Sequence, residues 1–217
     1  MKKIFGLLLF ALLILTVNGQ QIYFEAGKVI SLFDYKNSAS TSLSDLKGTT
    51  QSSLGLGFRM PLFKSSSHLS LGVSNNKYGA TSSDPVLGNY SEWDVSYLDV
   101  NLGVDYEFFK PEMKNADRYG FSVYVKGICA ADFLLKGKQR LNSQVFDLSG
   151  IEEFDKPVFF LRGAVGVYYY ITRSYVPFLQ YMFGRSFLVG NYTGQEQLRY
   201  LTHTVSIGFS VNLIYKK

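Results

Sequence analysis

The segment LDVNLGVDYEF, residues 98–108, shows most plainly how this chain folds. Its side chains alternate between an apolar set and a set that is polar or glycine. The apolar set is Leu98, Val100, Leu102, Val104, Tyr106 and Phe108, and the other is Asp99, Asn101, Gly103, Asp105 and Glu107. Successive side chains of a β-strand point to opposite faces, so this period of two predicts a strand with one apolar and one polar face.

The same alternation recurs along most of the chain, and no long window shows the helical period. We therefore expect an all-β fold of about eight antiparallel strands. The connections between these strands are expected at residues 36–51, 63–67, 79–92, 109–118, 136–156, 172–174 and 190–198. Two strands are less regular, because Lys28 interrupts the apolar face of the first and Arg185 falls on the apolar face of the seventh.

The first residues have the pattern of a secretory signal peptide. Lys2 and Lys3 precede an apolar run over residues 4–17, and Val17-Asn18-Gly19 offers a cleavage stretch. A membrane-anchoring helix is the alternative, but the run is shorter than the ~20 apolar residues that a span needs. We expect a signal peptide at residues 1–19 and one barrel domain at residues 20–217.

Composition sets limits on the partners of this 217-residue chain. Aromatic residues make up 16% and charged residues only 18%, whereas soluble domains carry about 25% charged residues. The net charge of +5 falls to +3 without residues 1–19, which does not suggest a nucleic-acid partner. Cys129 is the single cysteine, so we expect no disulfide framework.

Three features favour a membrane barrel over a soluble barrel. The polar faces carry mainly small residues, as in Ser70–Ser74 and Ser206–Asn212, which suit a crowded barrel interior. Long and short connections alternate, as they do between the outer and periplasmic ends of outer-membrane barrels. Aromatic residues collect near both strand ends and predict interfacial girdles: Tyr106, Phe108, Phe109, 168–170, Tyr175 and Tyr215 at one end, and Tyr35, Tyr78, Trp93 and Phe187 at the other.

The strand pattern, the Gly19-Gln20 junction and the final strand VSIGFSVNL, residues 205–213, resemble a known group of proteins. They are similar to the small outer-membrane β-barrels of the Bacteroidetes, the PorT-like group, and more distantly to the OmpX and OmpA barrels. This resemblance implies an outer-membrane location in a Gram-negative bacterium and a role as an accessory of envelope biogenesis or protein secretion. Tyr215 is followed by two lysines, whereas such barrels usually end in an aromatic residue.

The alternation also assigns side chains to the two faces of the barrel. The charged residues predicted to face the lumen are Arg59, Asp99, Asp105, Glu107, Lys126, Asp132 and Arg162. Opposite charges among them are expected to pair and fill the interior, and the alternative is a narrow charge-lined pore. On the last strand, the residues predicted to face lipid are Val205, Ile207, Phe209, Val211, Leu213 and Tyr215.

Little in the sequence suggests catalysis or a bound cofactor. His68 is expected in a short periplasmic connection and His203 on the outer face of the last strand, so the two do not form a metal site. A lipid-modifying barrel enzyme remains an alternative, although Val205 stands where that pattern needs a serine. We expect a non-enzymatic barrel without cofactors that contacts outer-membrane lipid, the barrel assembly machinery and a partner protein, through lateral surfaces or loops such as residues 136–156.

Overall fold

The computed structural model describes residues 19–36, 46–62, 64–84, 89–110, 120–172, 174–187 and 197–213. The predicted signal peptide, apart from Gly19, lies outside these ranges and stays a prediction, and so does the assignment of Tyr215. Among the described residues, no helix is long and apolar enough to cross a membrane.

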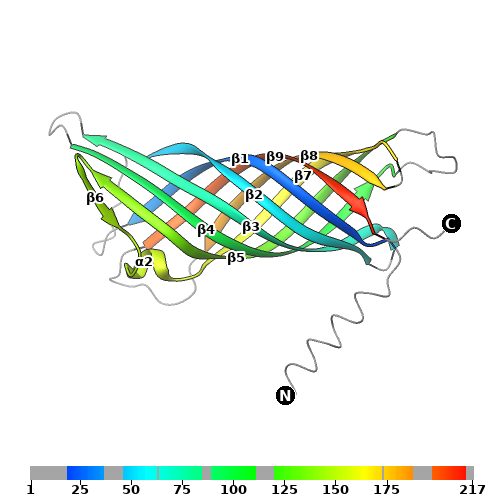
Figure 1. Ribbon diagram of the computed structural model, residues 1–217, viewed down its shortest axis with the longest axis horizontal. Coiled ribbons are helices and arrows are strands. Elements are labelled where there is room, and N and C mark those ends of the chain that lie inside the picture. Colours follow the sequence, from blue (N-terminus) through cyan, green and yellow to red (C-terminus); the bar gives the residue numbers. More distant parts are fainter. Residues whose placement is uncertain are drawn as a thin grey trace, which may run out of the picture.

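The described residues form nine strands and one short helical turn (Figure 1). The strands are β1 (Gln21–Lys36), β2 (Lys47–Leu62), β3 (Lys64–Asp84), β4 (Asn89–Phe108), β5 (Gly120–Leu141), β6 (Gln144–Asp147), β7 (Val158–Tyr170), β8 (Tyr175–Phe187) and β9 (Gln197–Asn212), and the turn is α2 (Glu152–Asp155).

The strands close into a barrel. Hydrogen-bonded neighbours follow the order β4-β3-β2-β1-β9-β8-β7-β5, and a further pairing of β4 with β5 completes a ring of eight strands. All of these pairings are antiparallel. Strand β6 lies outside the ring and extends β5 as a hairpin. The prediction of an antiparallel barrel of about eight strands is confirmed.

The strands are joined at two ends of the barrel. The start of β1 and the end of β9 lie at the same end, which we call the terminal end (Figure 1). At the terminal end the connections span residues 63, 109–119 and 171–174, and at the other end 37–46, 85–88, 142–157 and 188–196. The other end therefore carries most of the longer connections, which is the extracellular arrangement of outer-membrane barrels.

Four predicted connections are shorter in the structure than the sequence suggested. Residues 36–51 shrink to 37–46 because β2 begins at Lys47, and residues 63–67 shrink to residue 63 because β3 begins at Lys64. The expected connection at residues 79–92 is wrong in its bounds, because β3 and β4 continue to pair from Gly79↔Asp94 to Asp84↔Asn89. Within the expected connection at residues 136–156, β5 runs on to Leu141 and residues 144–147 form β6. The sequence did not predict these extensions, because strands that pair outside the membrane need no apolar outer face and so lack the alternating pattern.

The strands are staggered around the ring. From Gly27, the pairing passes in one direction through Ser206, Gln180 and Gly166 to Tyr124 on β5. In the other direction it passes through Ser53, Asn76 and Tyr97 to Leu134, further along the same strand. Each hydrogen-bonded row therefore rises toward the extracellular end as it passes from β7 through β9 and β1 to β4. Residues at equal height along the barrel axis consequently lie on a diagonal across the strands.

Candidate functional site

The predicted lumen residues occupy inward-facing positions on the strands. Six of them are buried: Arg59, Asp99, Asp105, Glu107, Asp132 and Arg162. Lys126 is half-buried, with its Nζ atom 5.1 Å from the centroid of the Tyr23 ring. The interior of an eight-stranded barrel is just wide enough to be filled by side chains, so these charges must satisfy one another.

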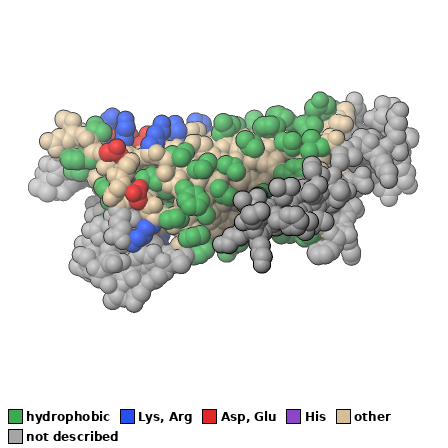
Figure 2. All heavy atoms as spheres, turned by 60° about the horizontal axis from the view of Figure 1, so that its bottom comes forward, with side chains coloured by type: hydrophobic (Ala, Val, Ile, Leu, Met, Phe, Trp, Pro, Cys, Tyr) green, Lys and Arg blue, Asp and Glu red, His purple; other side chains and the backbone are tan. Residues whose placement is uncertain are grey.

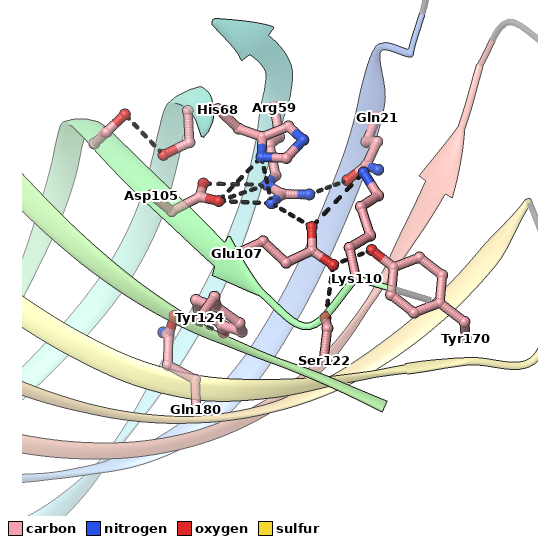
Figure 3. Close-up of polar contacts among 12 residues, drawn as sticks. Gln21, Arg59, His68, Asp105, Glu107, Lys110, Ser122, Tyr124, Tyr170 and Gln180 are labelled. Carbon is pink, nitrogen blue, oxygen red and sulfur yellow. Dashed lines mark hydrogen bonds and ion pairs between the residues drawn. The ribbon is translucent and has the colours of Figure 1, made fainter. Parts of the chain in front are cut away.

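Arg59 is the centre of a charge network near the terminal end of the lumen (Figure 3). Its Nε and Nη2 atoms donate to the Oδ1 and Oδ2 atoms of Asp105 at 3.1 and 2.6 Å. Its Nη1 atom donates to Gln21 Oε1 at 2.9 Å, and Nη2 also donates to His68 Nδ1 at 2.8 Å. A guanidinium that binds a carboxylate with two parallel bonds has a fixed orientation, which makes this a rigid layer.

Glu107 extends the same network toward β5 and β7. It accepts hydrogen bonds from Ser122 Oγ at 2.6 Å and from the hydroxyl of Tyr170. Lys110 Nζ lies 3.8 Å from its Oε2 atom. His68 belongs to this buried layer on β3, so the expectation that it lies in a periplasmic connection is wrong.

Arg162 organises a second layer, formed with two other predicted residues. Its Nη1 atom lies 2.5 Å from Asp99 Oδ2, and its Nη2 atom lies 3.0 Å from Asp132 Oδ1. Tyr78 donates to Asp132 Oδ2 at 2.6 Å, and Ser74 donates to Asp99 Oδ1 at 2.9 Å. One guanidinium thus links two carboxylates from different strands across the lumen, and both carboxylates have further donors.

Between the two layers lies a polar group that the sequence analysis did not select. Gln180 Nε2 and Ser206 Oγ both lie 3.4 Å from Glu25 Oε2, and Tyr124 donates to Gln180 Oε1 at 3.0 Å. Glu25 alternates with the apolar residues of β1, so its inward position was available from the pattern. Its partners were not, because they come from strands far away in the sequence.

The extracellular half of the lumen is mainly apolar. A buried cluster fills it, with Tyr78, Tyr97, Phe160 and Tyr200 as its largest members. The ring of Tyr200 contacts three of them, with centroid distances of 5.4 Å to Tyr78, 6.1 Å to Tyr97 and 6.2 Å to Phe160. Rings packed at these distances fill this level of the lumen.

Five of the aromatic residues assigned to the interfacial girdles therefore face the interior. Tyr78, Tyr168 and Tyr170 are buried, at 2%, 5% and 5% exposure, and Tyr35 and Trp93 pack against the buried lumen cluster. The assignment of these five residues to the girdles is wrong. Tyr168 stacks on Tyr124 with a centroid distance of 4.3 Å, and Arg59 Cζ lies 4.9 Å from its ring centroid. Their inward positions follow from the strand register. The abundance of aromatic residues near a strand end does not show which face of the strand each residue occupies.

The outer face of the barrel has the opposite polarity. On β9, the predicted lipid-facing residues Val205, Ile207, Phe209 and Leu213 are exposed and Val211 is partly exposed, whereas Ser206 and Ser210 are buried. In the view of Figure 2, hydrophobic side chains cover most of the barrel wall, and charged side chains gather toward the end away from the termini. An apolar exterior around a polar interior is the arrangement of a barrel that spans a membrane.

An ordered hairpin covers part of the extracellular end. Strand β6 pairs with β5 from Leu141↔Gln144 to Lys138↔Asp147, and Leu148 beyond it is 1% exposed within the apolar lumen cluster. The backbone N–H of Ser149 donates to Asp147 Oδ1 at 2.9 Å, which lowers the pKa of that carboxyl below its ordinary value. The turn at Asn142, with φ of 52°, uses a residue that tolerates the left-handed region.

The part of the chain that the structure describes holds no group of three or more histidine, cysteine or acidic side chains arranged to hold a metal ion. His203 lies on the outer face, where its Nδ1 atom is 2.7 Å from the hydroxyl of Tyr181. His68 and His203 are therefore on opposite sides of the barrel wall and share no site.

Comparisons with known proteins give structural similarities at low sequence identity. No protein-family model and no curated protein matches the sequence. Neisserial surface protein A is 10% identical, with 88% of this chain and 97% of that chain covered and a TM-score of 0.49. Ail of Yersinia pestis is 14% identical, with coverage of 89% and 99% and a TM-score of 0.40. The N-terminal barrel of Pseudomonas aeruginosa OprF is 12% identical, with coverage of 89% and 98% and a TM-score of 0.44.

The fold class rests on the strand pairing and on the polarity of the two faces. A closed antiparallel ring leaves no unpaired strand edge in the bilayer, and its outer side chains are mostly apolar where they meet lipid. The protein is an integral β-barrel of the outer membrane.

Proposed function

We propose that the protein is a non-enzymatic barrel that presents a rigid extracellular hairpin, residues 138–155, to a partner protein. The observation that carries this proposal is the combination of one buried anchor with exposed apolar side chains on the same hairpin. Leu148 is buried, whereas Val145 and Phe146 are 58% and 45% exposed, and Ile151 is also exposed. A fixed apolar surface loses little entropy on binding and favours docking of a partner.

Charged residues surround this apolar surface. Arg140 Nη1 lies 3.1 Å from Glu92 Oε2, which joins the hairpin strand to β4. The backbone of Asn142 also joins β4, because its N–H donates to Tyr90 O at 2.8 Å. An apolar centre with a polar rim is the usual arrangement of a protein-binding surface.

The resemblance to PorT-like barrels of the Bacteroidetes supports a role as an accessory of envelope biogenesis or protein secretion. It also supports the assignment of residues 1–19 as a signal peptide and residues 20–217 as the barrel. The packed aromatic cluster and the two arginine layers support a closed barrel over the alternative of a small pore. The outward pair of His203 and Tyr181, next to Val205, gives no support to a lipid-modifying enzyme.

Site-specific photocrosslinking on intact cells tests the hairpin directly. A benzophenone amino acid in place of Phe146 is expected to give a discrete crosslinked product, and the same group in place of Phe109, exposed near the terminal end, is the control. Val145→Asp should abolish the product at position 146 without changing the amount of barrel. The proposal fails if positions 146 and 109 give the same products, or if Val145→Asp leaves the product unchanged.

A further inference from the structure

The apolar outer face is interrupted by two basic residues. Lys28 on β1 and Arg185 on β8 point outward and are exposed. Lys28 lies between Val205 of β9 and Ser52 of β2, and Arg185 lies between Leu161 of β7 and Leu201 of β9. Within the described ranges, neither residue forms an ion pair with an acidic side chain. A charge on a lipid-facing wall is costly near the midplane and acceptable near the interface, where polar lipid groups begin.

His203 lies between these two residues at the same height. It is opposite Ile30, two residues beyond Lys28 on β1, and Arg185 is opposite Leu201, two residues beyond His203 on β9. Because the rows climb from β8 to β1, this diagonal runs parallel to the membrane plane. The three side chains thus form a short basic row, whose central member is held by the hydroxyl of Tyr181 at 2.7 Å.

The apolar outer wall continues past this row toward the extracellular end. Ile30 and Leu32 of β1 and Phe187 of β8 are exposed beyond Lys28 and Arg185. Next to Lys28 in sequence, the inward Val29 belongs to the apolar cluster that fills the extracellular half of the lumen. On β9, the inward positions on both sides of His203 are polar, at Thr202 and Thr204, and polar positions continue toward the terminal end at Ser206 and Ser210. The row therefore lies in the extracellular half of the apolar wall, where the long side chains of Lys28 and Arg185 can extend to bring their charges to the outer headgroups.

The wall below the row suits an acyl chain. Val205, Ile207 and Phe209 form a continuous exposed apolar strip on β9, directly toward the terminal end from His203. Phe209 stacks on Phe24 of β1 with a centroid distance of 5.3 Å, which gives the strip a flat aromatic base. The cations at the extracellular end of the strip match the charged headgroup of an anionic lipid, and the apolar strip beneath them matches its acyl chains.

We propose that Lys28, His203 and Arg185 bind the phosphate group of an anionic lipid in the outer leaflet, with its acyl chains against the strip formed by Val205, Ile207 and Phe209. This site goes beyond the proposed role of the hairpin and does not depend on it. A basic residue near a membrane surface favours an anionic lipid by about fivefold, so the two permanent cations together favour it by about one order of magnitude or more.

Quenching by brominated lipid measures this preference. The probe is Phe183→Trp on the outer face next to His203, in a Trp93→Phe background that removes the native tryptophan. The protein is reconstituted in phosphatidylcholine vesicles that contain a small fraction of brominated phosphatidic acid or, in the matched arm, brominated phosphatidylcholine. Leu102→Trp on β4, exposed on another part of the wall, is the control position.

At position 183, the brominated phosphatidic acid is expected to quench several-fold more than the brominated phosphatidylcholine, and at position 102 the two should quench alike. Lys28→Ala with Arg185→Ala should remove the difference at position 183, and free inorganic phosphate should not compete. Equal quenching by the two lipids at position 183, or a preference that survives the double substitution, would overturn the proposal. Competition by free phosphate would assign the site to a soluble anion and overturn the lipid assignment.

Discussion

At the scale of single residues, the lumen is held by two arginines that each serve two acidic side chains. Arg59 contacts Asp105 and Glu107, and Arg162 contacts Asp99 and Asp132. Alternation alone placed both arginines and all four acidic residues on the inner face. It did not give these pairings, because each joins strands whose relative register is decided by the closed ring.

Replacement of Arg162 tests how much this buried cation stabilises the fold. Arg162→Met leaves Asp99 and Asp132 buried without their cation, which destabilises a protein by about 3–5 kcal/mol. Equilibrium unfolding by urea in lipid vesicles measures the loss. Arg140→Met is the matched control, because the exposed Arg140–Glu92 pair is worth about 0–1 kcal/mol. Similar losses in the two variants would contradict the assignment of Arg162 as a central buried cation.

At the scale of strands, the alternation of apolar and polar residues predicted the membrane-spanning part of each strand well. It predicted the extension of the strands beyond the membrane poorly. Within the bilayer the two faces of β4 differ sharply in polarity, so the alternation of residues 98–108 predicted the strand correctly. Above that level the outer face becomes polar and the lumen apolar, as at Asp94 and Val95. The predicted period therefore fades where the environment changes, although the hydrogen-bonded ladder of β3 and β4 continues to Asp84↔Asn89.

Two substitutions on neighbouring strands test the faces at one height. Phe209 of β9 is exposed on the outer wall, and Phe178 of β8, paired with the adjacent Gly208, is buried in the lumen. In the Trp93→Phe background, brominated phosphatidylcholine should quench Phe209→Trp strongly and Phe178→Trp weakly, because only the first side chain meets acyl chains. Equal quenching at the two positions would contradict the inside and outside assignment.

At the scale of the whole molecule, the lumen is blocked twice by different chemistry. The ion-paired layers fill the half near the termini, and the ring cluster of Tyr78, Tyr97, Phe160 and Tyr200 fills the extracellular half beneath the hairpin. The sequence predicted paired charges, but the aromatic block appeared only once closure brought Tyr78, Phe160 and Tyr200 together from β3, β7 and β9. A lumen filled in this way leaves the outer wall and the extracellular surface as the surfaces for the proposed contacts.

The two blocks act in series, which predicts the electrical behaviour of the barrel. The protein in planar bilayers should show no steady ion conductance, and Tyr97→Ala with Tyr200→Ala should remain closed because the Arg162 layer still spans the lumen below the lost rings. Adding Arg162→Ala and Asp132→Ala should also leave the barrel closed, because the Arg59 layer still spans the lumen nearer the terminal end. Further addition of Arg59→Ala and Asp105→Ala removes both arginine layers and should produce discrete conductance steps. The shift in gel mobility on heating, measured on each variant, verifies that the barrel has folded before it is tested. Conductance by the variant that lacks only the two tyrosines would mean that the arginine layers pass ions, and the lumen would then be a gated pore and not a packed core.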